Sequence, residues 1–141
     1  MAEPEQSFIV RVPRNFNARA RDILADEIIA FIRRRTKNGL NINNKPFKQY
    51  SSSYQNSIEF TATGKSNTVN LTLTDDMLSS MVVKGSGVGF IRIGLSDSFA
   101  NDKASWNRQN GREFLGIAQK DLKNLTESVR SALGIRRSFF G

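Results

Sequence analysis

The spacing of apolar residues predicts two long amphipathic helices. From about Asn17, apolar side chains recur at spacings of three and four positions, with arginines and aspartates between them. Basic residues crowd the last turn of this helix, and Asn38-Gly39 supplies a left-handed stop. A second stretch of the same period runs from Ile117 to Leu133, with Gly134 as its C-cap. The apolar faces consist of Ala20, Leu24, Ile28, Phe31 and Ile32 in the first helix and Ala118, Leu122, Leu125, Val129 and Leu133 in the second.

Outside these helices, several short runs alternate apolar and polar residues, a pattern typical of strands. The first is β-rich, stops at Pro13 and is expected to be an edge strand or an ordered arm, and the others flank two glycine-containing turns, 64–67 and 85–87. The expected strands are Ser7–Val12, Ile58–Ala62, Thr68–Thr74, Met81–Lys84 and Gly89–Leu95, and Thr74-Asp75-Asp76 is expected to cap a short helix. The pattern therefore predicts an α+β fold, in which an antiparallel sheet of about four strands packs against two main helices.

The length of 141 residues fits a single domain. We expect residues 1–16 to form an N-terminal arm or strand, residues 17–133 the core, and residues 134–141 a C-terminal tail. Residues 38–57 are rich in Asn, Ser and Lys and show neither period, which predicts a long ordered loop. Both extended ends and this loop are candidate arms for reaching a neighbouring subunit.

The absence of cysteine and histidine narrows the chemistry of the chain. Without cysteine there are no disulfides, thiolate metal sites or cysteine nucleophiles, and without histidine the commonest general base and zinc ligand is missing. Gly85-Ser86-Gly87-Val88-Gly89 lacks the Gly-Lys-Ser/Thr ending of a phosphate-binding loop, and capping accounts for Asp75 and Asp76. We therefore expect no enzyme, no cofactor and no metal site.

The net charge of +8 indicates an acidic or phosphate-rich partner. The densest basic cluster lies at the end of the first helix and in the loop after it, and it is a candidate DNA-facing surface. Its members are Arg33, Arg34, Arg35, Lys37, Lys45 and Lys48. The alternative is a solvated helix end, in which these cations complement the helix dipole. A small nucleic-acid-binding protein without sequence preference is the second functional hypothesis.

Aromatic residues near these charges and at the two ends of the chain, together with two arginines of the C-terminal tail, are candidate contacts between subunits or with partners. They sit in the expected strand, the loop and the tail, where basic residues accompany them. The candidates are Phe8, Phe47, Tyr50, Tyr54, Arg136, Arg137, Phe139 and Phe140. A disordered C-terminal end is the competing interpretation of the last four.

No stretch of the sequence predicts a membrane-crossing or secretory segment. Arginines interrupt every apolar run among the first thirty residues, and no apolar run reaches the length of a membrane helix. We therefore expect no membrane partner and a protein that is made and used without crossing a bilayer.

Three segments in sequence order resemble the phage virion-morphogenesis and tail-completion family. The first is Ile32-Arg33-Arg34-Arg35-Thr36 with Gly39, Asn43, Asn44, Lys45, Pro46-Phe47 and the run Tyr50-Ser51-Ser52-Ser53-Tyr54. The second is Leu73-Thr74-Asp75-Asp76-Met77-Leu78-Ser79-Ser80-Met81, and the third is Asn110-Gly111-Arg112-Glu113-Phe114-Leu115-Gly116-Ile117, followed by Asp121. The resemblance extends from about residue 20 to residue 133. Asp75 departs from it, because the family often has glycine there.

This resemblance implies a structural protein of the neck of a tailed phage. Such a protein would form a homo-oligomeric ring, expected to be a hexamer, that completes or terminates the tail and joins it to the head connector. The implied partners are connector or adaptor proteins, tail tube or sheath proteins, and DNA that passes through the ring without base readout. The implied location is the virion.

Overall fold

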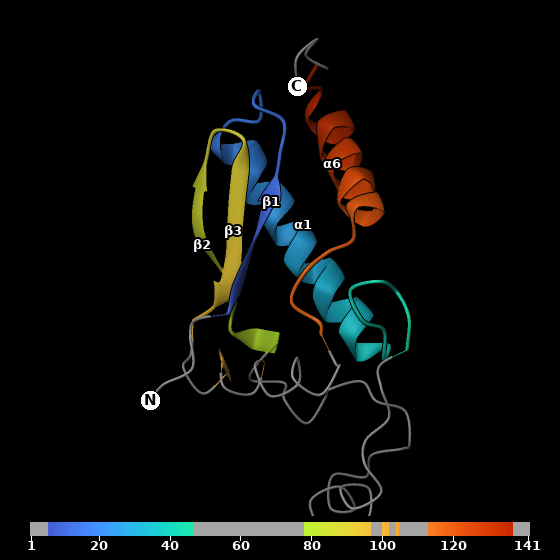
Figure 1. Ribbon diagram of the computed structural model, residues 1–141. Helices are drawn as coiled ribbons and strands as arrows, with labels where there is room; N and C mark the ends of the chain where they lie inside the picture. Colours follow the sequence, from blue (N-terminus) through green and yellow to red (C-terminus); the bar gives the residue numbers. More distant parts are fainter. Residues whose placement is uncertain (1–5, 47–77, 97–99, 102–103, 105–112, 137–141) are drawn as a thin grey trace, which may run out of the picture.

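The computed structural model describes residues 6–46, 78–96, 100–101, 104 and 113–136, and over these residues the predicted α+β class is confirmed. Two long helices accompany one antiparallel sheet of three strands (Figure 1). The elements are β1 Ser7–Arg11, α1 Ala18–Lys37, β2 Met81–Gly87, β3 Phe90–Leu95 and α6 Gln119–Leu133. The hairpin predicted over residues 58–74 lies outside the described residues.

The sheet has the strand order β1-β3-β2, so β3 is its centre. β1 pairs antiparallel with β3 from Ser7 opposite Gly94 to Arg11 opposite Phe90. Because side chains alternate between the two faces of a strand, Val10 and its partner Ile91 share the buried face with Ile93. Of the two alternatives expected for residues 1–16, an arm or a strand, the structure shows a strand at Ser7–Arg11, which pairs with β3.

Helix α1 covers the buried face of the sheet (Figure 1). Its start agrees with the helical period expected from about Asn17, and the Asn17 side chain caps it by accepting a hydrogen bond from the backbone N–H of Ala20 at 2.9 Å. It ends as predicted, with Asn38 as the C-cap and Gly39 at a φ of 81°. Leu24, Ile28 and Ile32 of this helix are fully buried against the strands.

Helix α6 packs along α1 and runs antiparallel to it (Figure 1). Near the end of α6, the guanidinium of Arg130 lies 5.5 Å from the centre of the Phe16 ring, which precedes α1. Arg130 also donates a hydrogen bond of 3.0 Å to the carbonyl of Arg136. The predicted apolar face is confirmed at Leu122 and Val129, which are buried, but Leu133 is 37% exposed and lies outside it.

The turn between β2 and β3 differs from the prediction. Gly85 and Gly87 belong to β2, and the chain reverses at Val88 and Gly89, where Gly89 has a φ of 87°. β2 also carries an irregularity between Val83 and Gly85, which is typical of a β-bulge. Gly85, Gly87 and Gly89 together have the composition of a turn, but of the three only Gly89 adopts the positive φ that this turn requires.

Candidate functional site

The described residues hold no constellation of side chains suited to catalysis by a metal. Within these ranges, no three or more His, Cys, Asp or Glu side chains gather to hold a metal ion. Nor does any helix in the described part of the chain have the length and apolarity needed to cross a membrane. Two surfaces of the described residues are candidates for function: the basic end of α1 and the exposed parts of the sheet.

The predicted basic cluster does not form one patch, because successive residues on a helix point about 100° apart. Arg33 turns toward the segment before β2 and donates hydrogen bonds to the carbonyls of Leu78, at 2.9 Å, and Ser79, at 3.4 Å. A pocket of about 250 Å³ lies there, lined by Arg33, Lys37, Leu78 and Ser79. Arg34 and Lys37 are exposed, so they remain candidates for an anionic partner.

Arg35 is wrong as a DNA-facing candidate, because it is 4% exposed and lies inside the protein. Its guanidinium donates to the carbonyls of Phe114 and Gly116, the latter at 3.0 Å, and sits 5.8 Å from the centre of the Phe31 ring. Burial lowers the pKa of Arg35 to about 10, and nearby Asp121 opposes this shift. Arg35 therefore joins the end of α1 to the segment that leads into α6.

The first part of the Asn-rich loop is an ordered turn. The Asn41 side chain accepts hydrogen bonds from the backbone N–H groups of Asn43 and Lys45, at 2.9 Å and 3.1 Å. Asn44 has a φ of 61°, and its side-chain amide donates a hydrogen bond of 2.8 Å to the carboxylate of Asp121 in the first turn of α6. This turn presents Lys45 to solvent, while Lys48 lies outside the described residues.

Few of the aromatic and basic contact candidates fall in the described part of the chain. Phe8 is half-buried on β1 and packs against the core, and Arg136 is exposed just after α6. The carbonyl of Arg136 accepts a hydrogen bond of 2.7 Å from the Asn15 side chain. The remaining candidates lie outside the described residues: Phe47, Tyr50, Tyr54, Arg137, Phe139 and Phe140.

The outer edge of β1 agrees with the edge strand that was one of the two expectations for this run, because β1 is an outer strand of the described sheet. The backbone N–H of Val12 donates a hydrogen bond of 3.0 Å to the carbonyl of Gly89. Val12 and Gly89 continue the register in which β1 pairs with β3, so they form a hydrogen-bonded pair of this ladder. Hydrogen-bonded and non-hydrogen-bonded pairs alternate along an antiparallel ladder. The backbone groups of Ser7, Ile9 and Arg11 therefore point away from β3, and no described residue gives them a backbone partner.

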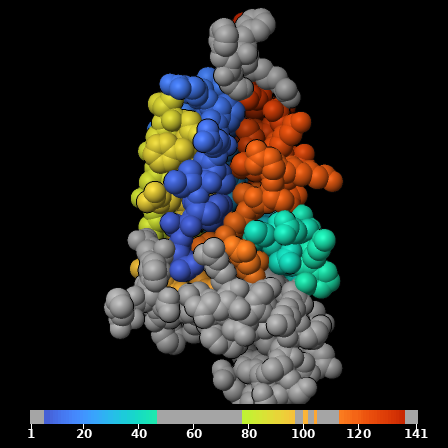
Figure 2. Space-filling view, viewed as in Figure 1, coloured from blue at the N-terminus to red at the C-terminus, as the bar shows by residue number. Residues whose placement is uncertain are grey.

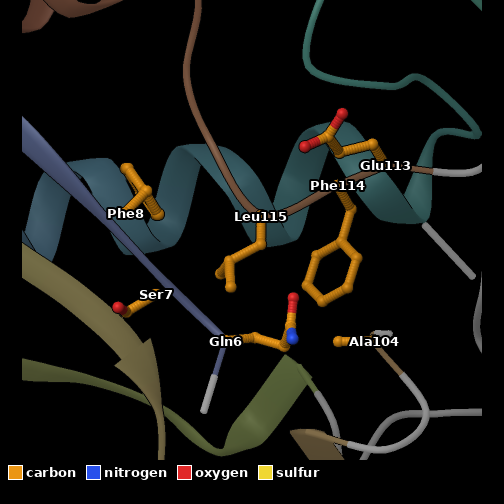
Figure 3. Close-up of a pocket in the computed structure, with 7 residues that line it drawn as sticks. All are labelled: Gln6, Ser7, Phe8, Ala104, Glu113, Phe114 and Leu115. Carbon is orange, nitrogen blue, oxygen red and sulfur yellow. The ribbon is translucent and has the colours of Figure 1, made fainter. Parts of the chain in front are cut away.

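Figure 2 shows the blue segment that contains β1 at the molecular surface, between the yellow strands and the orange-red α6. Beside the first half of β1 lies a pocket of about 230 Å³ (Figure 3). The side chains of Phe114, Leu115 and Gln6 converge on it, and Phe8 lies farther along the strand. The edge of β1 thus adjoins a hollow lined by both polar and apolar side chains.

Alternation along Ser7–Arg11 predicts which side chains share a face, and the stop at Pro13 suggested an edge strand, but the strand with which β1 pairs was not predicted. Edge position depends on pairing with β3, which follows more than seventy residues later in the chain. Comparison of the chain with protein-family models, with curated proteins and with solved structures finds no match.

Proposed function

We propose that this chain is a non-catalytic structural protein of the neck of a tailed-phage virion. In this role it forms a homo-oligomeric ring, a hexamer, that completes or terminates the tail and joins it to the head connector around the DNA passage. Its partners are further copies of itself, connector or adaptor proteins, tail tube or sheath proteins, and the passing DNA. The order of the three family-like segments along the chain supports this proposal.

The open edge of β1 is the observation that carries the proposal. An edge strand with unpaired N–H and C=O groups is a template for pairing with another chain. Ile9, in the middle of this strand, is 54% exposed, so the edge is accessible to a neighbouring chain. A structural subunit that pairs with a neighbour uses these outward backbone groups, whereas an isolated monomer does not.

The strand order is compatible with a ring. In the order β1-β3-β2, the two outer strands of the described sheet are different strands on opposite sides of β3. A contact between the β1 edge of one copy and a different surface of the next copy is heterologous, and heterologous contacts build rings when the rotation closes. A dimer in which two β1 edges pair with each other would close at two copies and would leave the β2 side of the described sheet unused.

Replacing Ile9 by proline tests this use of the edge. Because the Ile9 N–H points away from β3, proline removes only an outward donor and blocks strand pairing on that side. We expect Ile9→Pro to remain folded by circular dichroism and to be monomeric by light scattering. Ile9→Ala, the matched control, loses the same side chain but keeps the donor, and it should assemble as the wild type does.

The assembly of the wild type and of the two variants separates the possible outcomes. A wild-type chain that assembles while Ile9→Pro assembles equally well would exclude β1 pairing as the contact. A wild-type chain that stays monomeric with purified tails and connectors would contradict the neck function itself.

Sequence-independent binding of nucleic acid is the second candidate function. The exposed cations Arg34, Lys37 and Lys45, which make no ion pair with a described residue, favour it. Cations that contact phosphates release counterions, so the affinity should fall steeply as salt rises. A labelled duplex that binds tightly to a monomeric protein, with a steep salt dependence, would favour this function over the ring.

A further inference from the structure

The outer face of the sheet, opposite α1, presents cations and apolar side chains together. Alternation places Ile9 and Arg11 of β1 on this face with their direct partners Arg92 and Phe90 of β3. All four are exposed, Phe90 by 39%, while the intervening residues Val10 and Ile91 are buried against α1. These four residues, Ile9, Arg11, Phe90 and Arg92, are called the arginine face below.

The register fixes how the arginine face is arranged. Arg11 lies directly opposite Phe90, and Arg92 lies directly opposite Ile9, so each arginine has an apolar neighbour across the strands. Direct neighbours have Cβ atoms about 4.5–5.5 Å apart, and diagonal neighbours, such as the two arginines, are about 7–8 Å apart. Neither arginine side chain forms a hydrogen bond or an ion pair with another described residue. Both guanidinium groups are therefore available to a ligand.

On the β2 side of this face, the residues opposite Phe90 and Arg92 are glycines, which have no side chain. Gly87 is opposite Phe90, and a Cβ added to it would lie 2.7 Å from Cε1 of the Phe90 ring, so the ring lies over this glycine. Gly85 is opposite Arg92, and a Cβ there would meet no atom within 4 Å. An extended ligand can thus approach the backbone of β2 closely beside Arg92 and Phe90.

The charge of the sheet favours a polyanion as the occupant. The sequences of β1, β2 and β3 contain no aspartate or glutamate, and Lys84 of β2 adds an exposed cation near Gly94. Two copies packed through the same face would bring arginine against arginine, which is unfavourable. Arginine is well suited to phosphate because its planar fork presents paired donors, and an aromatic ring beside it suits a nucleic-acid strand.

We propose that the arginine face is a binding surface for the phosphate backbone of nucleic acid. The inference rests on the proposed function, in which the protein surrounds passing DNA, and it assigns the DNA contact to the sheet instead of the basic end of α1. The recognition is of phosphates and is independent of base sequence, because no side chain of the face is placed to read a base edge in a groove.

The test compares two double variants of the full chain by fluorescence anisotropy over a salt series, with a short labelled duplex and a single strand of equal length. Arg11→Ala/Arg92→Ala removes the two arginines of the face, and Arg34→Ala/Lys37→Ala, the matched control, removes the same charge from the end of α1. For the duplex, the slope of log affinity against log salt should fall by about 1.8 in the first variant, since each phosphate contact contributes about 0.9. For the single strand it should fall by about 1.4.

The control variant should keep the wild-type slope with both ligands. Equal losses in the two variants, or a larger loss in the control, would overturn the assignment to the sheet. Equally tight binding to poly-glutamate would also overturn it, because it would indicate an acidic protein as the partner. Thermal unfolding should show unchanged midpoints for both variants, since none of the four side chains is buried.

Light scattering on the same samples keeps this inference separate from the proposed function. A chain that assembles into rings but binds no nucleic acid overturns the inference and leaves the neck function standing. A chain that binds DNA through the arginine face as a monomer supports the inference and contradicts the ring.

Discussion

Arg35 provides the sharpest test of how the two helices are joined. Its guanidinium donates to the carbonyls of Phe114 and Gly116, and both of these residues are buried. Replacing Arg35 by alanine removes both donors and leaves the two carbonyls without them. A buried group that loses its hydrogen-bond partner costs about 1–3 kcal/mol, whereas removal of the buried charge recovers part of that cost.

We therefore expect Arg35→Ala to lower the free energy of unfolding by about 3 kcal/mol. This is a large share of the roughly 5–15 kcal/mol that stabilises a typical domain, and it corresponds to a fall in midpoint temperature of roughly 10 °C. Urea unfolding followed by circular dichroism measures the change. Arg34→Ala is the control, because Arg34 is the preceding residue but is exposed, and it should change stability by less than about 0.5 kcal/mol.

A third variant separates hydrogen bonding from packing. Arg35→Met keeps most of the side-chain volume but supplies no donor, so it should be destabilised nearly as much as Arg35→Ala if the two carbonyls dominate. Stability of Arg35→Met equal to the wild type would refute the role of the hydrogen bonds. Stability of Arg35→Ala equal to that of Arg34→Ala would refute the whole account of this junction.

Three further predictions concern the cap, the sheet and the pH dependence. Asn17→Ala should lower the free energy of unfolding in urea by about 1 kcal/mol, because it removes the N-cap of α1. Asn17→Asp should be nearly neutral, and equal stability of the alanine and aspartate variants would contradict the role of Asn17 as a cap. Gly94→Ala should cost about 1–3 kcal/mol, because its Cβ would lie 2.9 Å from the carbonyl oxygen of Gln6, and Gly85→Ala, with no atom within 4 Å, should cost much less. The chain has no histidine, and burial lowers the pKa of Arg35 only to about 10, so thermal midpoints should stay level from about pH 6 to 8.5. Between pH 10 and 12.5 the unfolded state holds the Arg35 proton more tightly, so this residue should add stability as pH rises there, and a transition near pH 7 would contradict this account.

The helices were predictable because their signals are local. The apolar period of α1 from about Asn17 and its stop at Asn38-Gly39 lie within or next to the helix, and the structure confirms both. The same holds for the end of α6 at Gly134, which adopts the left-handed conformation expected of a C-cap.

The candidate site was less predictable because it depends on distant partners. A run of Arg33, Arg34 and Arg35 indicates charge, but the fate of each residue is decided by what packs on that side of the helix. Arg35 turns inward because carbonyls 79 and 81 positions later in the chain come to meet it. No periodicity within the helix contains that information.

The sheet shows the same division between local and distant information. Alternation along a strand is enough to place Ile9 and Arg11 on one face of β1, and Phe90 and Arg92 on one face of β3. That these two pairs face the same way, side by side, follows only from the pairing of β1 with β3. The three glycines before Phe90 were read as a turn, because their composition did not reveal that the Phe90 ring lies over Gly87.

The mass of the assembled protein tests the central claim most directly. Native mass spectrometry of the full chain, over a concentration series at moderate salt and with Ile9→Pro measured beside it, gives the number of subunits. The account predicts a discrete ring of six copies for the wild type and a monomer for the proline variant. A wild-type chain that remains monomeric at every concentration, and also when mixed with purified tails and connectors, would contradict it.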